Sequence, residues 1–384
     1  METISADVVV VGAGPAGMAA TAAAVERGAS VVVLEAGNRI GGNAITSTGY
    51  LAFVHDDREG FYADALRAFE TAARRYALVW DAAAIRQFAA ESGETHRDLT
   101  SRGVRFSRIV TRPEHSVDRI YAVEDPAMFA RAYAADFENP RVRTMFGVRV
   151  DRLHTEDGRV TAVAAHRLDD DTRFIARARH GVVLASGGYQ AGHALRRRHQ
   201  PGGASESAYF GTFNCRGDGH VIGAAVGGDL VNMSHLPPMI LAPSTVAENA
   251  VAVNAAGARF HDETGPFDDR VTMLRRQKQG RGWYILDAFG VRAQARLIAQ
   301  MPQPPVTGRT IDQLAAAIDV PAERLTATVD RWNGFLASDA ATDPEFGRTA
   351  LPRCRRGLKE GPFIAVPMVE GVNFSCGGFR TTAR

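Results

Sequence analysis

The sequence predicts an α/β fold in which a doubly wound, Rossmann-like domain is followed by a smaller α+β domain. Residues 6–35 contain an apolar strand, a glycine turn, an alanine-rich helix and a second strand. This is the order of a βαβ unit. Residues 142–157 read as a single strand, and two further β-prone runs follow before residue 189. Asp157-Gly158 between the first two runs predicts a hairpin. The chain has 384 residues, more than one core commonly serves, so a second domain is expected.

Composition and charge indicate an ordinary globular protein. With 45% hydrophobic residues, 23% charged residues and a formal net charge of +2, nothing favours nucleic acid as a partner. Cys215, Cys354 and Cys376 lack C-x-x-C spacing and the 11 histidines lack metal-ligand spacing, so neither a disulfide framework nor a metal site is expected. The start, "METISADVVVVGAG", has no basic region and no long apolar run, which predicts a cytoplasmic protein without a membrane span.

The strongest functional signal is a G-x-G-x-x-G pattern between the first strand and the first helix. Gly12 permits a tight turn, Gly14 lets the backbone approach a pyrophosphate, and Gly17 lets the helix lie close to the sheet. The helix N-terminus that follows offers free N–H groups to phosphates. Glu35 ends the second strand, where a carboxylate can accept hydrogen bonds from ribose hydroxyls and disfavours a 2′-phosphate. The pattern predicts a dinucleotide site and leaves FAD and NAD open.

A second glycine pair follows in "NRIGGNAITSTGY", with Gly41, Gly42 and then the hydroxyl of Thr46. Here the sequence resembles the FAD-dependent oxidoreductase 2 family, which includes fumarate reductases, succinate dehydrogenases, 3-ketosteroid dehydrogenases and tricarballylate dehydrogenases. The resemblance implies that this stretch wraps the FAD pyrophosphate and reaches the flavin. Membrane-bound members attach FAD covalently to a histidine in this segment. Asn43 stands at that position, so the resemblance implies noncovalent FAD.

Three later motifs continue the resemblance in the family's order. Val150 matches a valine that contacts adenine, "ASGGY" at 185–189 matches a glycine pair beside the pyrophosphate and ribityl, and Gly217-Asp218-Gly219 matches a flavin-site element. Read alone, "ASGGY" is a strand end and Asp218 a helix cap. The expected cofactor-binding residues are Gly12, Gly14, Pro15, Ala16, Gly17, Glu35, Ala36, Gly41, Gly42, Asn43, Thr46, Val150, Ala185, Ser186, Gly187, Gly188 and Asp218.

A candidate acid–base pair comes from the second half of the chain. The segment "AVNAAGARFHDETGPFDDR" (252–270) resembles the start of the family's capping domain, in which a glutamate feeds protons to a catalytic arginine on a later helix. Glu263 and Arg292 match these positions. When hydride passes between the flavin and one carbon of a C=C bond, the adjacent carbon must exchange a proton, and an arginine needs a carboxylate to reset it. The alternative reading is a surface ion pair and an ordinary helix arginine.

The expected substrate site departs from that of fumarate reductases. Those enzymes would place carboxylate-binding histidines near Met239 and at Phe374, and neither residue is histidine here, so fumarate is a poor expectation. "NFSCGGF" is more similar to tricarballylate dehydrogenase-like members. The substrate is expected to be a small carboxylate or an enone. The expected substrate contacts are His235, Asn373, Ser375 and Cys376.

The resemblance divides the chain into an FAD-binding domain at 1–240, interrupted by helical segments at about 58–136, a capping domain at 241–370, and a shortened return to the FAD domain at 371–384. A helix pair at 310–318 and 321–338 belongs to the cap, with Pro321 in the first turn of the second helix. Family members add a hairpin, a strand and a helix after the late glycine pair, which this sequence lacks.

Three functions stay open at this point. The first is an FAD-dependent oxidoreductase that acts on a C–C or C=C bond beside a carboxylate or carbonyl, with an unknown electron donor or acceptor. The second is a family member that binds a nucleotide or a partner without flavin chemistry. The third is an NAD-linked dehydrogenase.

Overall fold

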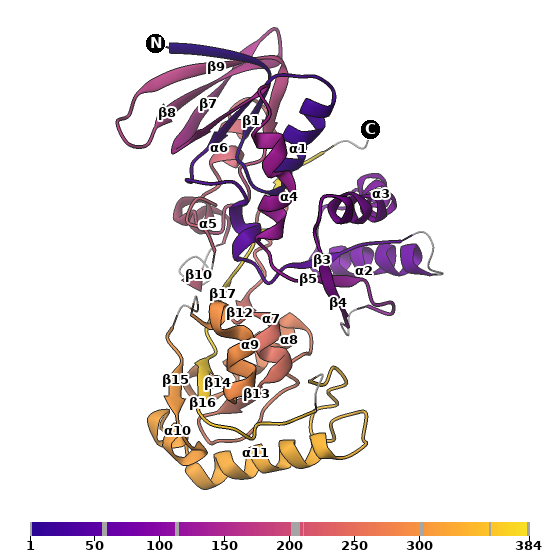
Figure 1. The fold of residues 1–384 in the computed structure, drawn as a ribbon, viewed down its shortest axis with the longest axis vertical. Helices are drawn as coiled ribbons and strands as arrows, with labels where there is room; N and C mark the ends of the chain where they lie inside the picture. Colours follow the sequence, from indigo (N-terminus) through magenta and orange to yellow (C-terminus); the bar gives the residue numbers. More distant parts are fainter. Residues whose placement is uncertain are drawn as a thin grey trace.

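The computed structural model describes residues 2–55, 60–111, 115–200, 208–209, 211–299, 301, 303–352 and 355–381. Figure 1 shows an elongated molecule, with a sheet and its helices at one end, a second sheet with helices at the other, and short strands and loops between them. The α2 and α3 helices stand to one side.

The first sheet has six strands in the order β6-β2-β1-β9-β8-β7. The β1 strand pairs in parallel with β2 and β9, β2 pairs in parallel with β6, and β7, β8 and β9 are antiparallel. Val9, Val10 and Val33 are fully buried at its centre, as expected for strands covered on both faces. The strands are β1 (Glu2–Val11), β2 (Val31–Glu35), β6 (Val142–Phe146), β7 (Val148–Glu156), β8 (Arg159–Arg167) and β9 (Arg173–Leu184).

Helices α1 (Pro15–Glu26) and α4 (Met128–Phe137) pack together beside this sheet. The predicted hairpin is present, since Glu156 pairs with Arg159 across Asp157 and Gly158, whose φ angles are 50° and 74°. The single strand expected over 142–157 is wrong. It breaks at Gly147, with φ 64°, and its halves join opposite edges of the sheet.

The helical insertion at 58–136 contributes two strands to a small sheet that the sequence did not predict, and the third strand precedes the insertion. Its strands β3 (Tyr50–Ala52), β5 (Ile120–Val123) and β4 (Phe106–Val110) lie in that order. Helices α2 (Phe61–Arg75) and α3 (Ala82–Ser101) lie beside it. The Phe53 ring packs edge-on against Phe106 and Tyr121, with centroids 5.8 and 5.7 Å apart.

The cap is a four-stranded antiparallel sheet in the order β13-β14-β16-β15. The predicted helix pair packs on it through Leu314, Leu325 and Val329, but Pro321 is the N-cap of the second helix rather than part of its first turn. The cap elements are α7 (Ser244–Asn249), β13 (Val251–Asn254), α8 (Phe267–Arg275), η3 (Lys278–Gly280), β14 (Gly282–Leu286), α9 (Ala288–Ile298), β15 (Val306–Gly308), α10 (Ile311–Ala317), α11 (Ala322–Ala337) and β16 (Phe363–Pro367).

After the cap, the chain returns toward the first sheet. Its late glycine pair permits this, because a Cβ on Gly377 would lie 2.5 Å from the Met233 Cα. The β18 strand then pairs with β11, and β17 lies between β10 and β12. The domain boundaries at 240 and 370 remain predictions. The elements of this middle region are α5 (His193–His199), β10 (Ala208–Tyr209), α6 (Asp218–Ala224), β11 (Leu230–Val231), β12 (Met239–Ile240), β17 (Glu370–Val372) and β18 (Gly378–Phe379).

A buried ion cluster holds the cap together. The Glu263 carboxylate accepts hydrogen bonds from Arg259 Nε and Nη2 and from Arg348 Nη1, each at 2.8 Å, and from the Ala252 amide at 2.9 Å. Arg259 Nη1 also donates to Asp343 at 2.6 Å. All four charged side chains are at most 3% exposed. Burial raises the pKa of Glu263, but the charges of Arg348 and Arg259 outweigh it and lower this pKa from 4.5 to about 2.

We expect Glu263→Gln to destabilise the protein by about 3–5 kcal/mol, because both buried guanidinium groups lose an anionic partner and only Arg259 keeps another, Asp343. Glu345→Gln is the matched control, since Glu345 is 40% exposed and 3.7 Å from Arg259, and it should cost less than about 1 kcal/mol. Denaturant unfolding measures both. Because the Glu263 pKa is lowered on folding, its contribution is complete above pH 4.5 and is lost as the pH falls toward 2. Equal losses for the two variants would contradict this account.

Candidate cofactor and active site

A cavity of about 510 Å³, here called the nucleotide pocket, opens at the carboxyl ends of β1, β2 and β9 and reaches β7 and α6. Most of the predicted cofactor-binding residues line it. Three do not, since Gly17 and Gly41 lie outside its described lining and Thr46 lines a second pocket. The predicted residues that line it are Gly12, Gly14, Pro15, Ala16, Glu35, Ala36, Gly42, Asn43, Val150, Ala185, Ser186, Gly187, Gly188 and Asp218.

The glycines form a cradle of bare backbone. Gly12 has φ 100°, and a Cβ there would lie 2.5 Å from the Ala185 carbonyl oxygen. A Cβ on Gly17 would lie 1.9 Å from the Gly12 oxygen, so only glycine lets α1 start this close to the turn. A Cβ on Gly42 would lie 2.9 Å from the Gly14 Cα. No side chain caps the N-terminus of α1, which leaves first-turn N–H groups for a pyrophosphate.

Glu35 is held in place at the end of β2, on the wall of the nucleotide pocket. Its carboxylate accepts hydrogen bonds from the Ala13 amide at 2.7 Å and the Gly37 amide at 2.6 Å. A carboxylate has about four acceptor positions, so Glu35 keeps capacity for sugar hydroxyls. The cradle and this acid together fit a dinucleotide.

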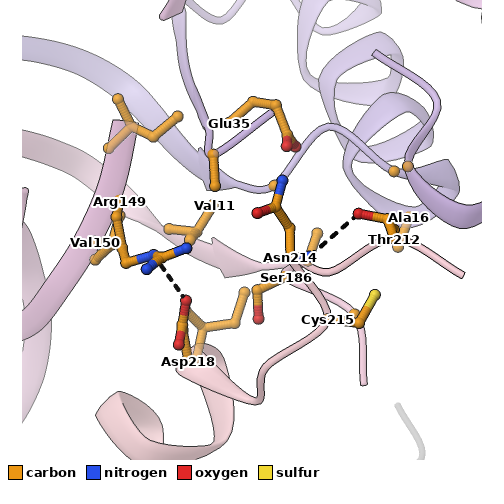
Figure 2. A pocket seen from close by; sticks show the side chains of 18 of the residues that line it. Val11, Ala16, Glu35, Arg149, Val150, Ser186, Thr212, Asn214, Cys215 and Asp218 are labelled. Atoms are coloured by element: carbon orange, nitrogen blue, oxygen red, sulfur yellow. Dashed lines mark hydrogen bonds and ion pairs between the residues drawn. The ribbon is translucent and has the colours of Figure 1, made fainter. Parts of the chain in front are cut away.

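An ion pair lies on the side of the nucleotide pocket that faces Glu35. Arg149 Nε lies 3.2 Å from Asp218 Oδ2, and Figure 2 shows the two side chains pointing toward one another from β7 and α6. Asp218 begins α6 after Gly217, whose φ is 83°. Sequence reasoning found Asp218 and the neighbouring Val150 but missed Arg149, because no motif marks it.

Asn43 ties the η1 turn (Gly42–Thr46) to a loop from the middle of the chain. Its Oδ1 accepts from the Thr212 amide at 2.7 Å, and its Nδ2 donates to Tyr209 Oη at 3.3 Å and Cys215 Sγ at 3.2 Å. Burial raises the pKa of Tyr209 to about 12 and also raises that of Cys215. Thr212, Asn214 and Cys215 line the pocket and were missed, although they stand next to the predicted Gly-Asp-Gly motif.

A second cavity of about 400 Å³, here called the cap pocket, meets the nucleotide pocket at Asn43. Its walls come from the segment around η1 and β3, from the middle region and from the cap. Its described lining comprises Asn43, Thr46, Ser47, Thr48, Tyr50, Ile120, Gly211, Met239, Leu241, Ala242, Pro243, Ser244, Phe267, Leu297, Asn373 and Phe374.

The structure brings one of the four predicted substrate residues to this pocket. Asn373 lines it, and its side-chain oxygen is buried without a hydrogen-bond partner. His235, Ser375 and Cys376 are not among the described lining residues. The His235 ring lies 4.5 Å from that of Tyr76. Ser375 lines a separate small cavity, and the Cys376 amide donates to the His235 carbonyl at 3.1 Å.

The predicted catalytic pair is not joined in the part of the chain that the structure describes. Glu263 is buried in the ion cluster of the cap, with its carboxylate occupied by Arg259 and Arg348. Arg292 is exposed on α9 and is not among the described residues that line either pocket. Leu297 on the same helix does line the cap pocket. The catalytic roles of Glu263 and Arg292 remain predictions.

Tyr50 was missed and is the one titratable side chain among the described residues of the cap pocket. Its Oη donates to Glu248 Oε1 at 2.9 Å and accepts from Arg108 Nη2 at 2.8 Å, and Arg108 also pairs with the Glu248 carboxylate. Burial lowers the pKa of Arg108, but Glu248 and Tyr50 outweigh it, so the net shift is upward. These three residues come from β3, β4 and the cap helix α7.

The parallel strands β1, β2, β6 and β9, the glycine cradle and the fixed acid define a dinucleotide-binding protein with a capping domain. A family model described as "FAD binding domain" matches residues 7–384, and the chain belongs to that family. The match confirms the predicted family and FAD as its cofactor.

Two curated relatives that match this chain have names that give different reactions. NADH:acrylate oxidoreductase of Vibrio harveyi is 27% identical over 463 residues, which cover 97% of this chain and 45% of that protein. A 3-oxosteroid 1-dehydrogenase of Mycolicibacterium smegmatis is 27% identical over 286 residues, covering 63% of this chain and 50% of that protein. The chain therefore spans about half the length of these relatives.

Solved structures confirm the fold class. The open conformation of a flavocytochrome c3 fumarate reductase has a TM-score of 0.75 at 23% identity and covers 99% of this chain and 69% of its own. A 3-ketosteroid Δ1-dehydrogenase from Sterolibacterium denitrificans has a TM-score of 0.72 at 16% identity and covers 99% of this chain and 90% of its own. Within the described residues, no helix is long and apolar enough to span a membrane.

We expect Gly17→Ala to lower the affinity for FAD at least tenfold, about 1.4 kcal/mol, because its methyl group would push α1 away from Gly12. Gly334→Ala is the matched control, since a Cβ there meets nothing within 4 Å inside α11. It should leave FAD affinity unchanged and stabilise the protein by roughly 0.5–1 kcal/mol. Quenching of flavin fluorescence on titration measures the affinity. Unchanged FAD binding by Gly17→Ala would refute the cradle.

Proposed function

We propose that this chain binds FAD noncovalently and catalyses hydride transfer at a C–C or C=C bond adjacent to a carbonyl or carboxylate. The observation that carries the proposal is the meeting of two pockets at Asn43, one with a dinucleotide cradle and one between the FAD domain and the cap. Bound FAD supplies the hydride acceptor or donor. An asparagine in place of a nucleophilic side chain at the junction supports noncovalent binding.

The chain's own groups would hold the cofactor in the following way. The N-terminus of α1 and the backbone of Gly12, Gly14 and Gly42 receive the pyrophosphate, and Glu35 receives the ribose hydroxyls. Val150 and the strand end at 185–188 form further walls. We propose 1–240 as the FAD domain, 241–370 as the cap and 371–384 as the return.

Substrate must also exchange a proton, and we propose two candidates for that step. The first is Tyr50 Oη, which lines the cap pocket and donates a hydrogen bond to Glu248 Oε1, 2.9 Å away. In dehydrogenation it would pass its proton to Glu248 and take up the proton that the substrate loses, and in reduction it would give its proton to the substrate and regain one through Glu248. The second is Arg292 with Glu263, which the family resemblance suggests. The exposure of Arg292 and the occupied carboxylate of Glu263 favour Tyr50.

The relatives support the reaction class. The names of two of them give acrylate and a 3-oxosteroid as substrates, and in both compounds the reacting bond lies beside a carboxylate or a carbonyl. A small molecule of one of these classes is the proposed substrate, and the protein is proposed to act in the cytoplasm.

Purified protein incubated with FAD and passed through a desalting column is expected to keep the absorbance of oxidised flavin and to lose it on denaturation in acid, because the cofactor is not covalently attached. Absorbance spectra before and after denaturation test this. Retention of an adenine nucleotide but not of flavin would instead select a nucleotide-binding family member without redox chemistry. Dependence on a nicotinamide cofactor without flavin would select a nicotinamide-linked dehydrogenase.

The proton donor is tested with Tyr50→Phe, which keeps the ring and removes the hydroxyl. We expect kcat to fall by about 10²–10⁴ while FAD binding stays unchanged, in an assay that follows flavin reduction or reoxidation by acrylate, fumarate or 4-androstene-3,17-dione. Arg292→Ala is the comparison variant and should retain activity. Loss of turnover in Arg292→Ala but not in Tyr50→Phe would assign the step to arginine.

A further inference from the structure

The side chains that line the cap pocket indicate which class of ligand it can bind. Among the lining residues that the structure describes, none is an aspartate, glutamate, lysine, arginine or histidine. The polar groups are hydroxyls and side-chain amides. Eight of the sixteen described lining residues are apolar, namely Ile120, Met239, Leu241, Ala242, Pro243, Phe267, Leu297 and Phe374.

The two charged groups that hydrogen-bond to the Tyr50 hydroxyl are paired with each other. Arg108 and Glu248 stand behind Tyr50, pair with each other and both hydrogen-bond to its hydroxyl. Their side chains are 21% and 15% exposed, so this pair is partly desolvated. A carboxylate that entered the pocket would lose its water without gaining a free cation from the described lining.

The unpaired polar groups fit a neutral ligand. The buried Asn373 oxygen accepts no hydrogen bond from the described residues, and it would repel a full negative charge more strongly than the partial charge of a neutral carbonyl oxygen. Thr46 and Ser47 donate their hydroxyl protons to the carbonyls of Asn43 and Ala44. The hydroxyls of Thr48 and Ser244 make no hydrogen bond to the described residues, so each can donate to a carbonyl oxygen.

We propose that the cap pocket binds a neutral, mainly apolar carbonyl compound, a ketone or an enone, rather than a mono- or dicarboxylate. Apolar walls would enclose its hydrocarbon part, and hydroxyl donors would receive its carbonyl oxygen. A volume of about 400 Å³ lies in the range of pockets for small organic ligands. This inference rests on the proposed function and names the substrate class of the same site.

The test compares two probes on the full chain, with and without FAD. Equilibrium dialysis measures binding of labelled 4-androstene-3,17-dione, a neutral diketone, and competition by fumarate, a dianion. We expect saturable binding of the diketone and no displacement by an approximately tenfold excess of fumarate. Displacement by fumarate, or no binding of the diketone to protein that retains FAD, would overturn the proposal. Failure to retain FAD is a separate result, which counts against the proposed function.

Two matched variants locate the binding. Ala242→Phe adds a ring to the cap pocket and is expected to weaken diketone binding at least tenfold. Ala340→Phe makes the same change in another pocket, beside Trp332, and should leave binding unchanged. Circular dichroism and FAD binding show that both variants fold. Equal affinity of the two variants for the diketone would place the ligand elsewhere and refute the assignment.

Discussion

The close approach of bare backbone at the start of the chain is the constraint on which the site depends. Gly12 lies against the Ala185 carbonyl, Gly17 lies against Gly12, and Gly42 lies against Gly14. Each contact leaves no room for a methyl group, so the turn, α1, the end of β9 and the η1 turn hold one another in place. The N-terminus of α1 and the carboxylate of Glu35 are thereby fixed on the same pocket. The turn and the start of α1 are encoded within residues 12–17, and the contacts with Gly42 and Ala185 bring more distant segments against them.

For that reason most of the nucleotide pocket was predictable. The motif at Gly12 and the hairpin at Asp157 depend on neighbouring residues, and local conformational preference is strong there. The cap pocket was less predictable. Tyr50 acquires its partners only when β3 and β4 pair with β5 and the cap helix α7 lies nearby. No spacing in the sequence encodes contacts between residues 50, 108 and 248.

Glu263 shows why residue type alone did not settle a role. A glutamate after an arginine suits a proton relay and also suits an ion pair, and the sequence left both open. Its carboxylate is fully buried between Arg259 and Arg348, and the second of these guanidinium groups comes from 85 residues further along the chain. A long-range partner of this kind occupies the hydrogen-bonding positions of a buried carboxylate. The local motif does not show whether such a partner is present.

The bridge from Tyr50 and Arg108 to Glu248 connects the small sheet to the cap. One carboxylate therefore has two duties, since it anchors the cap and accepts the hydrogen bond of the pocket's phenol. Displacement of the cap from the small sheet would separate the phenol from its acceptor. The position of the cap and the hydrogen bonding of the phenol are thus coupled through a single side chain, and a substitution at Glu248 would alter both at once.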